Sequence, residues 1–499
     1  MNKTLKGIIG GGVLLGVLGG VLAFLKLTDK KPEQDSSSSA AAEEIWLWHA
    51  HSDDISQITV EPAEGEKYVA NRKIDRTETT DVYGSTAVQD IANYYLEGYE
   101  DLPMSTVTIR TLATRSPELA AVSIVLEHAE DSDMSRFGLD HATRVTYVVD
   151  GQDEPIIFLI GDKTQVDSCY YLRMEGGDTV YTVSESAMEP FLKDVKSYLG
   201  TTVIADLADD DDTIVESVRI SRKNLDYDIA IEYDETISET DRSGGMAMHT
   251  MVEPFYCMLS PDKSTDATHG LFGLTAAEVL TPHPTQAEID ACGFDDPFVT
   301  VTMVTDDGKQ TVFRLADTYE SEDGNQYYYG MVEGINCIYG FSEDASIYDN
   351  VVPGDISSKN IINLYVWDVA RTRLSANGKT LDFKGSGTDQ SDFVLTLNGE
   401  PYEDNERYRQ LYAFLLGTKA EDLIVEEIQP EGEVLAEILL EQLDGTHSYD
   451  IKFYPAGTQK AYVSVNGEIR YRCRKSYVET LIHNIEIFSD PNEAIKTTW

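Results

Sequence analysis

The 499-residue chain contains 88 aspartate and glutamate residues against 39 lysine and arginine residues, and its formal net charge is -49 at pH 7. Such an acidic surface repels phosphate backbones, which argues against nucleic acid as a partner, and it also keeps crowded molecules apart in solution. Hydrophobic residues make up 41% of the chain, which is enough for packed cores, and the length is enough for about three domains.

The first feature in chain order is an uncharged run of nineteen residues, 7–25, with lysines on both sides. As a helix rising about 1.5 Å per residue, this run reaches about 28 Å, which matches the hydrocarbon core of a bilayer. We therefore predict a transmembrane helix at 7–25 after a short cytoplasmic N-terminus, residues 1–6. A cleaved signal peptide is the alternative, but its apolar region is usually shorter and its cleavage site closer behind.

The lysines decide the orientation of this helix only weakly, and the acidic bulk of the chain favours a body outside the cytoplasm. Gly12, Gly16 and Gly20 repeat at every fourth position of the segment. Small residues at that spacing allow a second membrane helix, from a partner or from another copy of the chain, to approach closely. Glycine-rich export segments are common, so the same residues also fit an anchor without a partner.

Residues 26–44 show no apolar periodicity and are expected to form a flexible linker. Treated as a coil, the last seventeen of them reach only about 20 to 25 Å. The folded part of the chain is therefore expected to stay close to the membrane.

The stretch His-Ala-His-Ser-Asp-Asp follows the linker at 49–54. His49, His51 and Asp53 could offer nitrogen and oxygen ligands to a metal, as a His-x-His-x-Asp-His run does in hydrolases of the metallo-β-lactamase kind. That run has a histidine where Asp54 stands here. The metal site is therefore one interpretation, and an ordinary edge strand is the other.

We favour the strand at this position. Alternation along a strand places Trp46 and Trp48 on one face and the two histidines on the other. The corresponding stretch of the next repeat, which starts at Ala205, has aspartates and no histidine. Because a repeated scaffold does not need these histidines, neither a metal nor any other cofactor is expected.

The rest of the chain repeats itself at an offset of 155 to 158 residues. Each copy has a turn containing glycine and aspartate, an alternating Val/Thr strand and an Asp-Gly hairpin turn, and a weaker third copy starts at Leu443. The matching segments are 137–151 with 292–308, 158–162 with 313–317, and 170–186 with 328–344. We predict three tandem modules, at 45–202, 203–360 and, more divergent, 361–499.

Each module is expected to contain a four-stranded antiparallel meander with Asp-Gly or Asn-Gly turns. An amphipathic helix should follow the meander, in the first module at 184–200, where Ser184 can cap the start and Gly200 can end the helix. Further helices are predicted at 86–102 and 407–417. The predicted fold class is α+β, with mainly antiparallel sheets and segregated helices.

Tyrosines at equivalent repeat positions, Tyr170 and Tyr328, are the candidate binding residues of the modules. Exposed tyrosines stack on sugars or anchor protein partners, but aromatic residues are also favoured in strands for packing reasons. The five cysteines are few, odd in number and widely spaced, so no disulfide framework or Cys-x-x-Cys site is expected. The usual catalytic motifs are missing, and no catalytic residue is predicted.

The repeated segments resemble a known family, the membrane-anchored bacterial proteins grouped as domain of unknown function 4340 (DUF4340). The family pattern of a Gly-Leu-Asp-x-Pro turn, a strand, an Asp-Gly hairpin, an Ile-Gly-Asp and paired tyrosines is matched best at 137–186. The copy at 292–343 supplies Pro297, where the first copy has Ala142. Members are often encoded beside ABC-type transporter components related to gliding machinery, so the resemblance implies a transport-accessory role in the envelope. No catalytic residues come with the family.

The expected function is that of a non-enzymatic, single-span envelope protein whose extracytoplasmic body binds a protein partner, such as a transporter subunit. Two alternatives stay open. An envelope hydrolase would need a cleft in which acids converge with a raised pKa. A carbohydrate-binding surface module would use the strand tyrosines and would bind glycans.

Overall fold

The computed structural model describes residues 45–499 except 81–85, 166, 209–211, 238–246, 323, 344–345, 363, 388–392, 444 and 446–447. The predicted cytoplasmic N-terminus, transmembrane helix and linker, including Gly12, Gly16 and Gly20, lie outside the described residues. Within the described ranges, no helix combines the length and the hydropathy that a membrane crossing requires.

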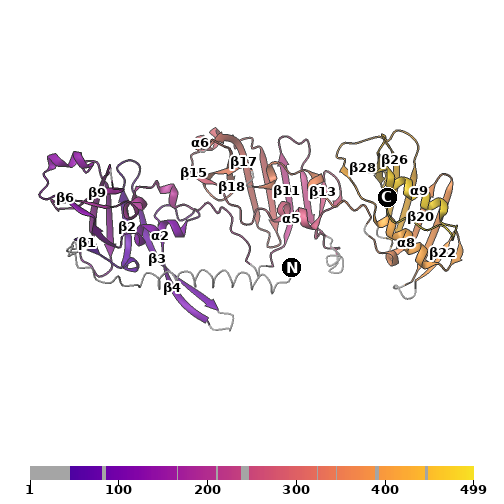
Figure 1. The fold of residues 1–499 in the computed structure, drawn as a ribbon, viewed down its shortest axis with the longest axis horizontal. Helices are drawn as coiled ribbons and strands as arrows, with labels where there is room; N and C mark the ends of the chain where they lie inside the picture. Colours follow the sequence, from indigo (N-terminus) through magenta and orange to yellow (C-terminus); the bar gives the residue numbers. More distant parts are fainter. Residues whose placement is uncertain are drawn as a thin grey trace, which may run out of the picture.

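Three large antiparallel sheets lie one after another along the longest axis of the molecule (Figure 1). The first module contains β1 (Ile45–His49), η1 (Ser52–Asp54), β2 (Ile55–Glu61), β3 (Tyr68–Thr80), β4 (Thr86–Leu96), α2 (Thr106–Thr114), β5 (Glu118–Ala121), β6 (Ser123–Leu126), η2 (Asp131–Phe137), β7 (Thr143–Val149), β8 (Ile156–Lys163), β9 (Cys169–Met174), β10 (Val180–Ser184), α3 (Glu185–Met188), η3 (Glu189–Leu192) and η4 (Val195–Tyr198).

The second and third modules follow with their own sheets. The second contains β11 (Val215–Arg222), β12 (Ile229–Tyr233), β13 (His249–Glu253), β14 (Cys257–Met258), α5 (Pro261–His269), β15 (Glu278–Pro282), α6 (Gln286–Ala291), β16 (Val299–Thr305), β17 (Gln310–Glu320), β18 (Gln326–Val332), β19 (Cys337–Ser342), η5 (Ile347–Asp349) and α7 (Pro353–Ile356). The third contains η6 (Val366–Asp368), β20 (Val369–Ala376), β21 (Lys379–Ser386), β22 (Val394–Leu397), β23 (Glu400–Tyr402), α8 (Asn405–Leu416), β24 (Asp422–Leu423), β25 (Ala436–Gln442), β26 (Ser448–Ala456), β27 (Lys460–Val465), β28 (Glu468–Arg474) and α9 (Lys475–Ile487).

The three large sheets share one topology. Their strand orders are β4-β3-β2-β7-β8-β9-β10-β6, β14-β13-β12-β11-β16-β17-β18-β19-β15 and β23-β22-β21-β20-β25-β26-β27-β28-β24. In each sheet, two meanders run outward from a central antiparallel pair, and a helix between the meanders is followed by a short strand that closes the far edge. The prediction of repeated modules of mainly antiparallel sheet is therefore confirmed.

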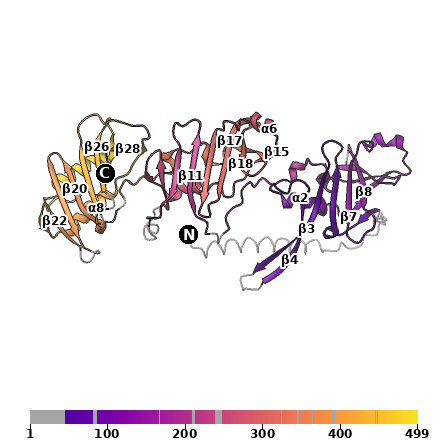
Figure 2. The same ribbon diagram turned by 180° about the vertical axis from the view of Figure 1, so that it is seen from behind.

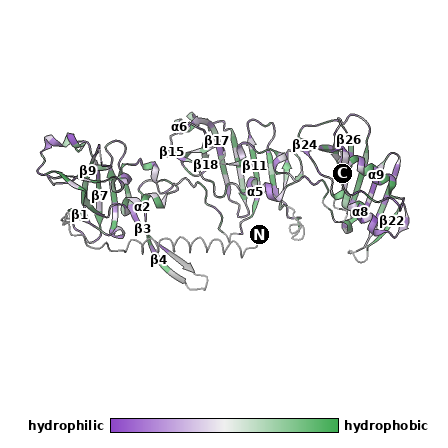
Figure 3. Ribbon diagram, viewed as in Figure 1, coloured by the Kyte–Doolittle hydropathy of each residue, from purple (hydrophilic) through white to green (hydrophobic). Residues whose placement is uncertain are grey.

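The core follows from the alternation of side chains along the strands. In β16, every second residue is buried, beginning with Val299 and Val301, while the threonines between them are half-exposed. The same alternation runs through β7 of the first sheet and β25 of the third, and Figure 3 shows apolar and polar residues mixed along the strands. One continuous apolar core extends through the first and second modules, and a separate core fills the third.

The hairpin turns have the backbone that their residues favour. Asn377-Gly378, Asn398-Gly399 and Asn466-Gly467 all have positive φ at both positions, from 50° to 96°. That is the condition for a type I′ turn, which matches the twist of the two strands that it joins. The predicted Asp-Gly turns at 150–151 and 307–308 also carry a left-handed glycine.

The helix predicted at 86–102 is wrong, because this segment begins with strand β4. Ala92, Tyr94 and Leu96 are buried and the residues between them are not, which is strand rather than helix periodicity. β4 pairs with β3 along its whole length, whereas β2 pairs with β3 only at residues 68–71. The remainder of β3 and β4 leaves the sheet as a two-stranded ribbon (Figure 2).

The helix of this part of the first module is α2, which the sequence prediction missed. It buries Ile109, Leu112 and Ala113 at helical spacing. Its content of threonine, valine and isoleucine favours a strand when judged by propensity alone. α5 and α8 occupy the same place in the other modules, and α8 confirms the helix predicted at 407–417.

The single helix predicted at 184–200 is also wrong, since the chain forms three short helical pieces there: α3, η3 and η4. Pro190 has no N–H to continue a helix, and Lys193 is extended, with φ -83° and ψ 147°. The Asp194 side chain then caps η4 by accepting a hydrogen bond from the Lys196 N–H at 2.9 Å. The predicted apolar residues Met188 and Phe191 are nevertheless fully buried.

Acidification is expected to weaken the second module through buried His249. Its Nε2 donates to the Val215 carbonyl at 2.7 Å, and burial lowers the pKa of His249 and of neighbouring His269 below 6.5. Below pH 6.5 the unfolded chain therefore binds protons that the folded module does not. The free energy of unfolding should fall by up to about 1.4 kcal/mol per pH unit for each histidine, down to its folded-state pKa.

Hydrogen exchange of β11 and β13 peptides at pH 5.5 and 7.5, corrected for intrinsic rates, measures this loss. The His249→Gln variant should show a smaller difference between the two pH values than the unchanged chain. An equal difference in both proteins would show that His249 does not cause the pH dependence.

Candidate functional site

The modules are joined by one repeated backbone contact. The segment that leaves a module pairs with the segment that follows the helix of the next module, at Thr202 with Thr275 and at Asn360 with Lys419. In the first module, β1 takes the place of the leaving segment and pairs with β5. We call each of these backbone pairings between consecutive modules a joint. The stretch that contains the two histidines therefore occupies the position that a joint has in the later modules.

The edge strand after each joint has different neighbours in the three modules. β15 lies against η4 of the first module, and β24 lies against α7 of the second, where Leu423 and Val425 pack on the preceding core. β6 is the equivalent strand of the first module, and the described chain contains no earlier module to cover it. Beside and along β6, Val122, Ile124 and Val125 are 61%, 41% and 38% exposed. We call these three residues the free edge.

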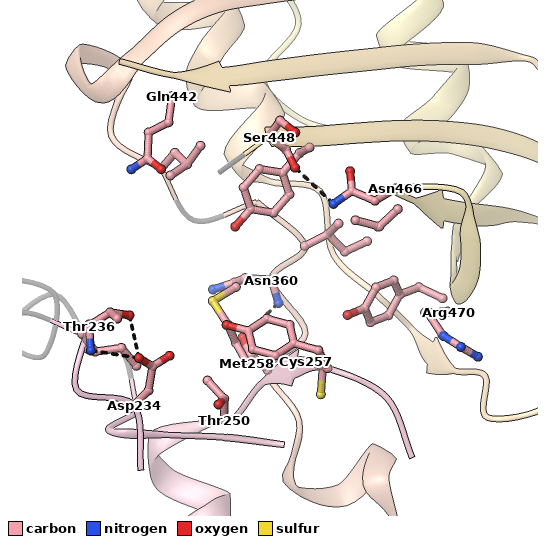
Figure 4. Close-up of a pocket in the computed structure, with 18 of the residues that line it drawn as sticks. Asp234, Thr236, Thr250, Cys257, Met258, Asn360, Gln442, Ser448, Asn466 and Arg470 are labelled. Atoms are coloured by element: carbon pink, nitrogen blue, oxygen red, sulfur yellow. Dashed lines mark hydrogen bonds between the residues drawn. The ribbon is translucent and has the colours of Figure 1, made fainter. Parts of the chain in front are cut away.

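A cavity of about 480 Å³ lies between the second and third modules. Asp234 and Thr236 of the second module lie across the cavity from Ser448 and Asn466 of the third (Figure 4). The segment that joins the two modules contributes a further wall, which includes Asn360. The cavity is therefore bounded by both modules and by the segment that joins them.

Tyrosine hydroxyls are among the polar groups that line the cavity. Tyr256, Tyr449 and Tyr471 line it, and burial raises the pKa of each hydroxyl, so all three are neutral at physiological pH. Among the described residues, none of these hydroxyls has a hydrogen-bond partner. Burial also raises the pKa of the Cys257 thiol to about 12, so this cysteine is not a nucleophile at neutral pH.

Of the charged side chains that line the cavity, Arg470 pairs with Glu468, and the Asp234 carboxylate is hydrogen-bonded to a neutral neighbour. The Arg470 guanidinium donates to Glu468 at 2.8 Å and lies over the ring of Phe255, 4.6 Å from its centroid. The Asp234 carboxylate accepts hydrogen bonds from the N–H and the hydroxyl of Thr236, at 2.9 and 2.6 Å. Arg470 is therefore not free to hold an anionic ligand.

The histidines proposed as metal ligands lie at a strand end and a helix cap. His49 Nδ1 lies 3.8 Å from Glu118, and its ring lies 4.4 Å from Trp46. His51 Nδ1 accepts from the Asp53 N–H at 3.4 Å, which caps η1. Nowhere in the described part of the chain do three His, Cys, Asp or Glu side chains gather in the way a metal site needs.

Trp46 and Trp48 do not share a face of β1, so the predicted alternation is wrong at this point. A β-bulge between them shifts the register against β5. Trp48 is therefore buried and stacks on Phe158 at 4.6 Å, whereas Trp46 is 46% exposed.

The two tyrosines singled out in the repeat lie on β9 and β18. Tyr170 and Tyr328 are both partly buried and pack against the apolar core. The Tyr328 ring is parallel to that of Phe298, at 5.6 Å. The structure does not bring Tyr170 and Tyr328 together, and neither of them lines the cavity between the second and third modules.

Carboxylates and cysteines give little support to catalysis in the described residues. Every carboxyl group there whose pKa is shifted has a lowered pKa because of a donor at its side, as Arg144 does for Glu175 and Lys460 for Asp422. A general acid needs the opposite shift. All five cysteines are free thiols, and all except Cys292 are buried.

The cavity tyrosines had no signal in the sequence, because Tyr256 and Tyr449 are distant in the chain and meet only through the joint. The free edge, in contrast, had a signal in the sequence. The run Ser-Ile-Val-Leu at 123–126 has consecutive apolar residues without alternation, which marks a strand that is apolar on both faces.

Residues 95–297 match the model of a family described as Domain of unknown function (DUF4340). The family resemblance predicted from the sequence is thus confirmed, over a range that covers more than half of the first module and more than half of the second. None of the curated proteins and none of the solved structures that were compared matches the chain significantly.

Proposed function

We propose that this member of the DUF4340 family is a non-enzymatic, membrane-anchored protein of the cell envelope that binds a protein partner, such as a subunit of an ABC-type transporter. The observation that carries the proposal is the free edge of the first sheet. Its apolar side chains are exposed at the one position where the repeated architecture otherwise places a neighbouring module.

The equivalent edges of the other modules indicate what the partner contributes. β15 and β24 are covered by the short helical segments η4 and α7 of the preceding module. A partner segment with one helical turn and apolar side chains can cover Val122, Ile124 and Val125 in the same way. Burying a fully exposed side chain of this kind contributes about 1.5 to 3 kcal/mol, so burying the exposed parts of these three can contribute about 2 to 4 kcal/mol together and stabilise a specific contact.

The position of the free edge fits a partner in the membrane. β6 follows β5, and β5 pairs with β1, the first described strand of the chain. The predicted linker before β1 reaches only about 20 to 25 Å from the predicted anchor. With such an anchor, the free edge would lie within reach of a permease in the same membrane.

A photo-crosslinking residue at position 124 should capture a membrane permease in cells, identified by mass spectrometry. The matched control places the same residue at Val394, which is 63% exposed on β22 of the third sheet. An Ile124→Lys variant should lower capture from a probe at position 122 about tenfold or more, because the lysine charge would have to be buried unpaired.

Two outcomes would contradict this function. One is the same yield of the same protein from positions 124 and 394, which would show non-specific contact. The other is full capture by the Ile124→Lys variant, which would show that the apolar edge does not hold the partner.

A further inference from the structure

We propose that the cavity between the second and third modules binds a neutral, hydroxyl-rich ligand of the size of a short oligosaccharide. This site is separate from the free edge, and its ligand goes beyond the partner-binding role and does not depend on it. The cavity volume of about 480 Å³ falls within the range of about 300 to 1,000 Å³ that is typical of small-molecule sites.

The polar groups of the cavity match hydroxyl groups. The hydroxyls of Tyr256, Tyr449, Tyr471 and Ser448 can each donate one hydrogen bond and accept others, and the side-chain amide of Asn360 donates through its NH2 group and accepts through its oxygen. A sugar hydroxyl also both donates and accepts. A ligand with several hydroxyls can therefore satisfy this mixed set of groups, whereas phosphate, which is mainly an acceptor, leaves most of their acceptor atoms without a donor.

Charge excludes an anionic ligand from this site. The only arginine of the lining, Arg470, is held by Glu468 and by the ring of Phe255, and no lysine is present among the described lining residues. The net charge of -49 repels anions further.

Tyrosine rings supply the apolar part of the recognition. Tyr256 is 62% exposed, an unusual state for so large a ring, and it lies at the cavity together with the half-buried Tyr449 and Tyr471. A tyrosine offers a rigid apolar face with a polar end, which suits a sugar that has C–H faces and hydroxyl edges. Because the rings come from two modules, the bound ligand would touch both.

Isothermal titration calorimetry of the full chain with maltotriose, cellotriose and chitotriose tests the proposal. Inorganic phosphate and choline are titrated in the same way, as an anionic and a cationic comparison. We expect one-to-one saturable binding of at least one trisaccharide and no binding of phosphate. Tyr449→Phe and Tyr471→Phe keep the ring and remove one hydrogen bond each, so each should weaken binding about three- to tenfold.

Two further variants separate a binding effect from a folding effect. Tyr454→Phe is the matched control, since Tyr454 lies on the same strand, β26, outside the cavity, and it should leave the affinity unchanged. Ser448→Trp places a large ring at an exposed cavity residue and should abolish binding while far-UV circular dichroism stays unchanged.

The proposal is overturned if no trisaccharide gives a saturable signal with the folded chain. It is also overturned if Tyr454→Phe weakens binding as much as Tyr449→Phe does. Binding of choline with the same dependence on Tyr449 would show a cation site and would overturn the neutral-ligand assignment.

Discussion

The Gly138→Ala variant is expected to lower the free energy of unfolding of the first module by about 2 to 5 kcal/mol. Gly138 has φ +64°, a left-handed conformation that costs a residue with a Cβ about 1 to 2 kcal/mol. An added Cβ would also lie 2.4 Å from the carboxyl carbon and 2.9 Å from the backbone nitrogen of Asp162. The backbone of β8 must then shift, and overpacking of this kind costs about 1 to 3 kcal/mol more.

Gly151→Ala is the control that separates the clash with Asp162 from the cost of the left-handed backbone. Gly151 has φ +78° in the same module, and an added Cβ there meets no atom within 4 Å. This variant should lose only the conformational part, about 1 to 2 kcal/mol. Hydrogen exchange of β7 and β8 peptides in both variants measures the difference, and equal losses would show that the contact with Asp162 does not matter.

The second module makes the same contact 155 residues later. Gly293 has φ +83°, and its added Cβ would lie 2.7 Å from the carboxylate of Asp317. All the closest atoms there belong to a side chain that can rotate. Gly293→Ala should therefore destabilise its module in the same direction as Gly138→Ala but by less.

The Arg407→Leu variant is expected to lower the free energy of unfolding of the third module by about 3 kcal/mol. The Arg407 guanidinium donates hydrogen bonds to the backbone carbonyls of four residues near the C-terminus at 2.7 to 3.1 Å: Ile487, Phe488, Asp490 and Glu493. Hydrogen bonds from a charged group contribute about 1.5 to 3 kcal/mol, and bonds made by one side chain do not add fully.

Arg409→Leu is the matched control for this prediction. Arg409 lies two residues further along α8 and is exposed, so its replacement should change stability by no more than about 0.5 kcal/mol. Hydrogen exchange should show faster exchange across residues 488–499 in Arg407→Leu only. Unchanged protection of that segment would show that the arginine does not hold it in place.

Much of the fold was predictable because it depends on local patterns. The Asn-Gly and Asp-Gly turns have a backbone that follows from the residue types, and strands such as β16 alternate in the sequence as they do in the sheet. The offset of 155 residues between Gly138 and Gly293 also separates the aspartates that contact them. Sequence self-similarity therefore reported true structural equivalence.

The errors occurred where tertiary contacts override local preference. β4 contains residues that also fit a helix, but eleven residue pairs with β3 stabilise the strand. α2 has strand-forming residues, but Ile109 and Leu112 are buried at helical spacing. The bulge at Trp46 and Trp48 depends on pairing with β5, which lies about seventy residues further along the chain.

The cavity could not be predicted because no local segment contains it. Its tyrosines come from two modules, which are joined by the pairing of Asn360 with Lys419. The free edge is different, because its apolar run can be recognised in the sequence. That this run is uncovered, however, follows only from the structure, in which the described chain has no earlier module beside it.

The pairing of Thr202 with Thr275, and of Asn360 with Lys419, is a relation between backbones and needs no particular side chains. Duplication of one module within the gene would recreate the same backbone pairing at the new boundary. The chain can therefore gain or lose whole modules without needing a new kind of contact between them. The number of modules would then set how far the last one extends from the first, and evolution could adjust that span while the two ends keep their own surfaces.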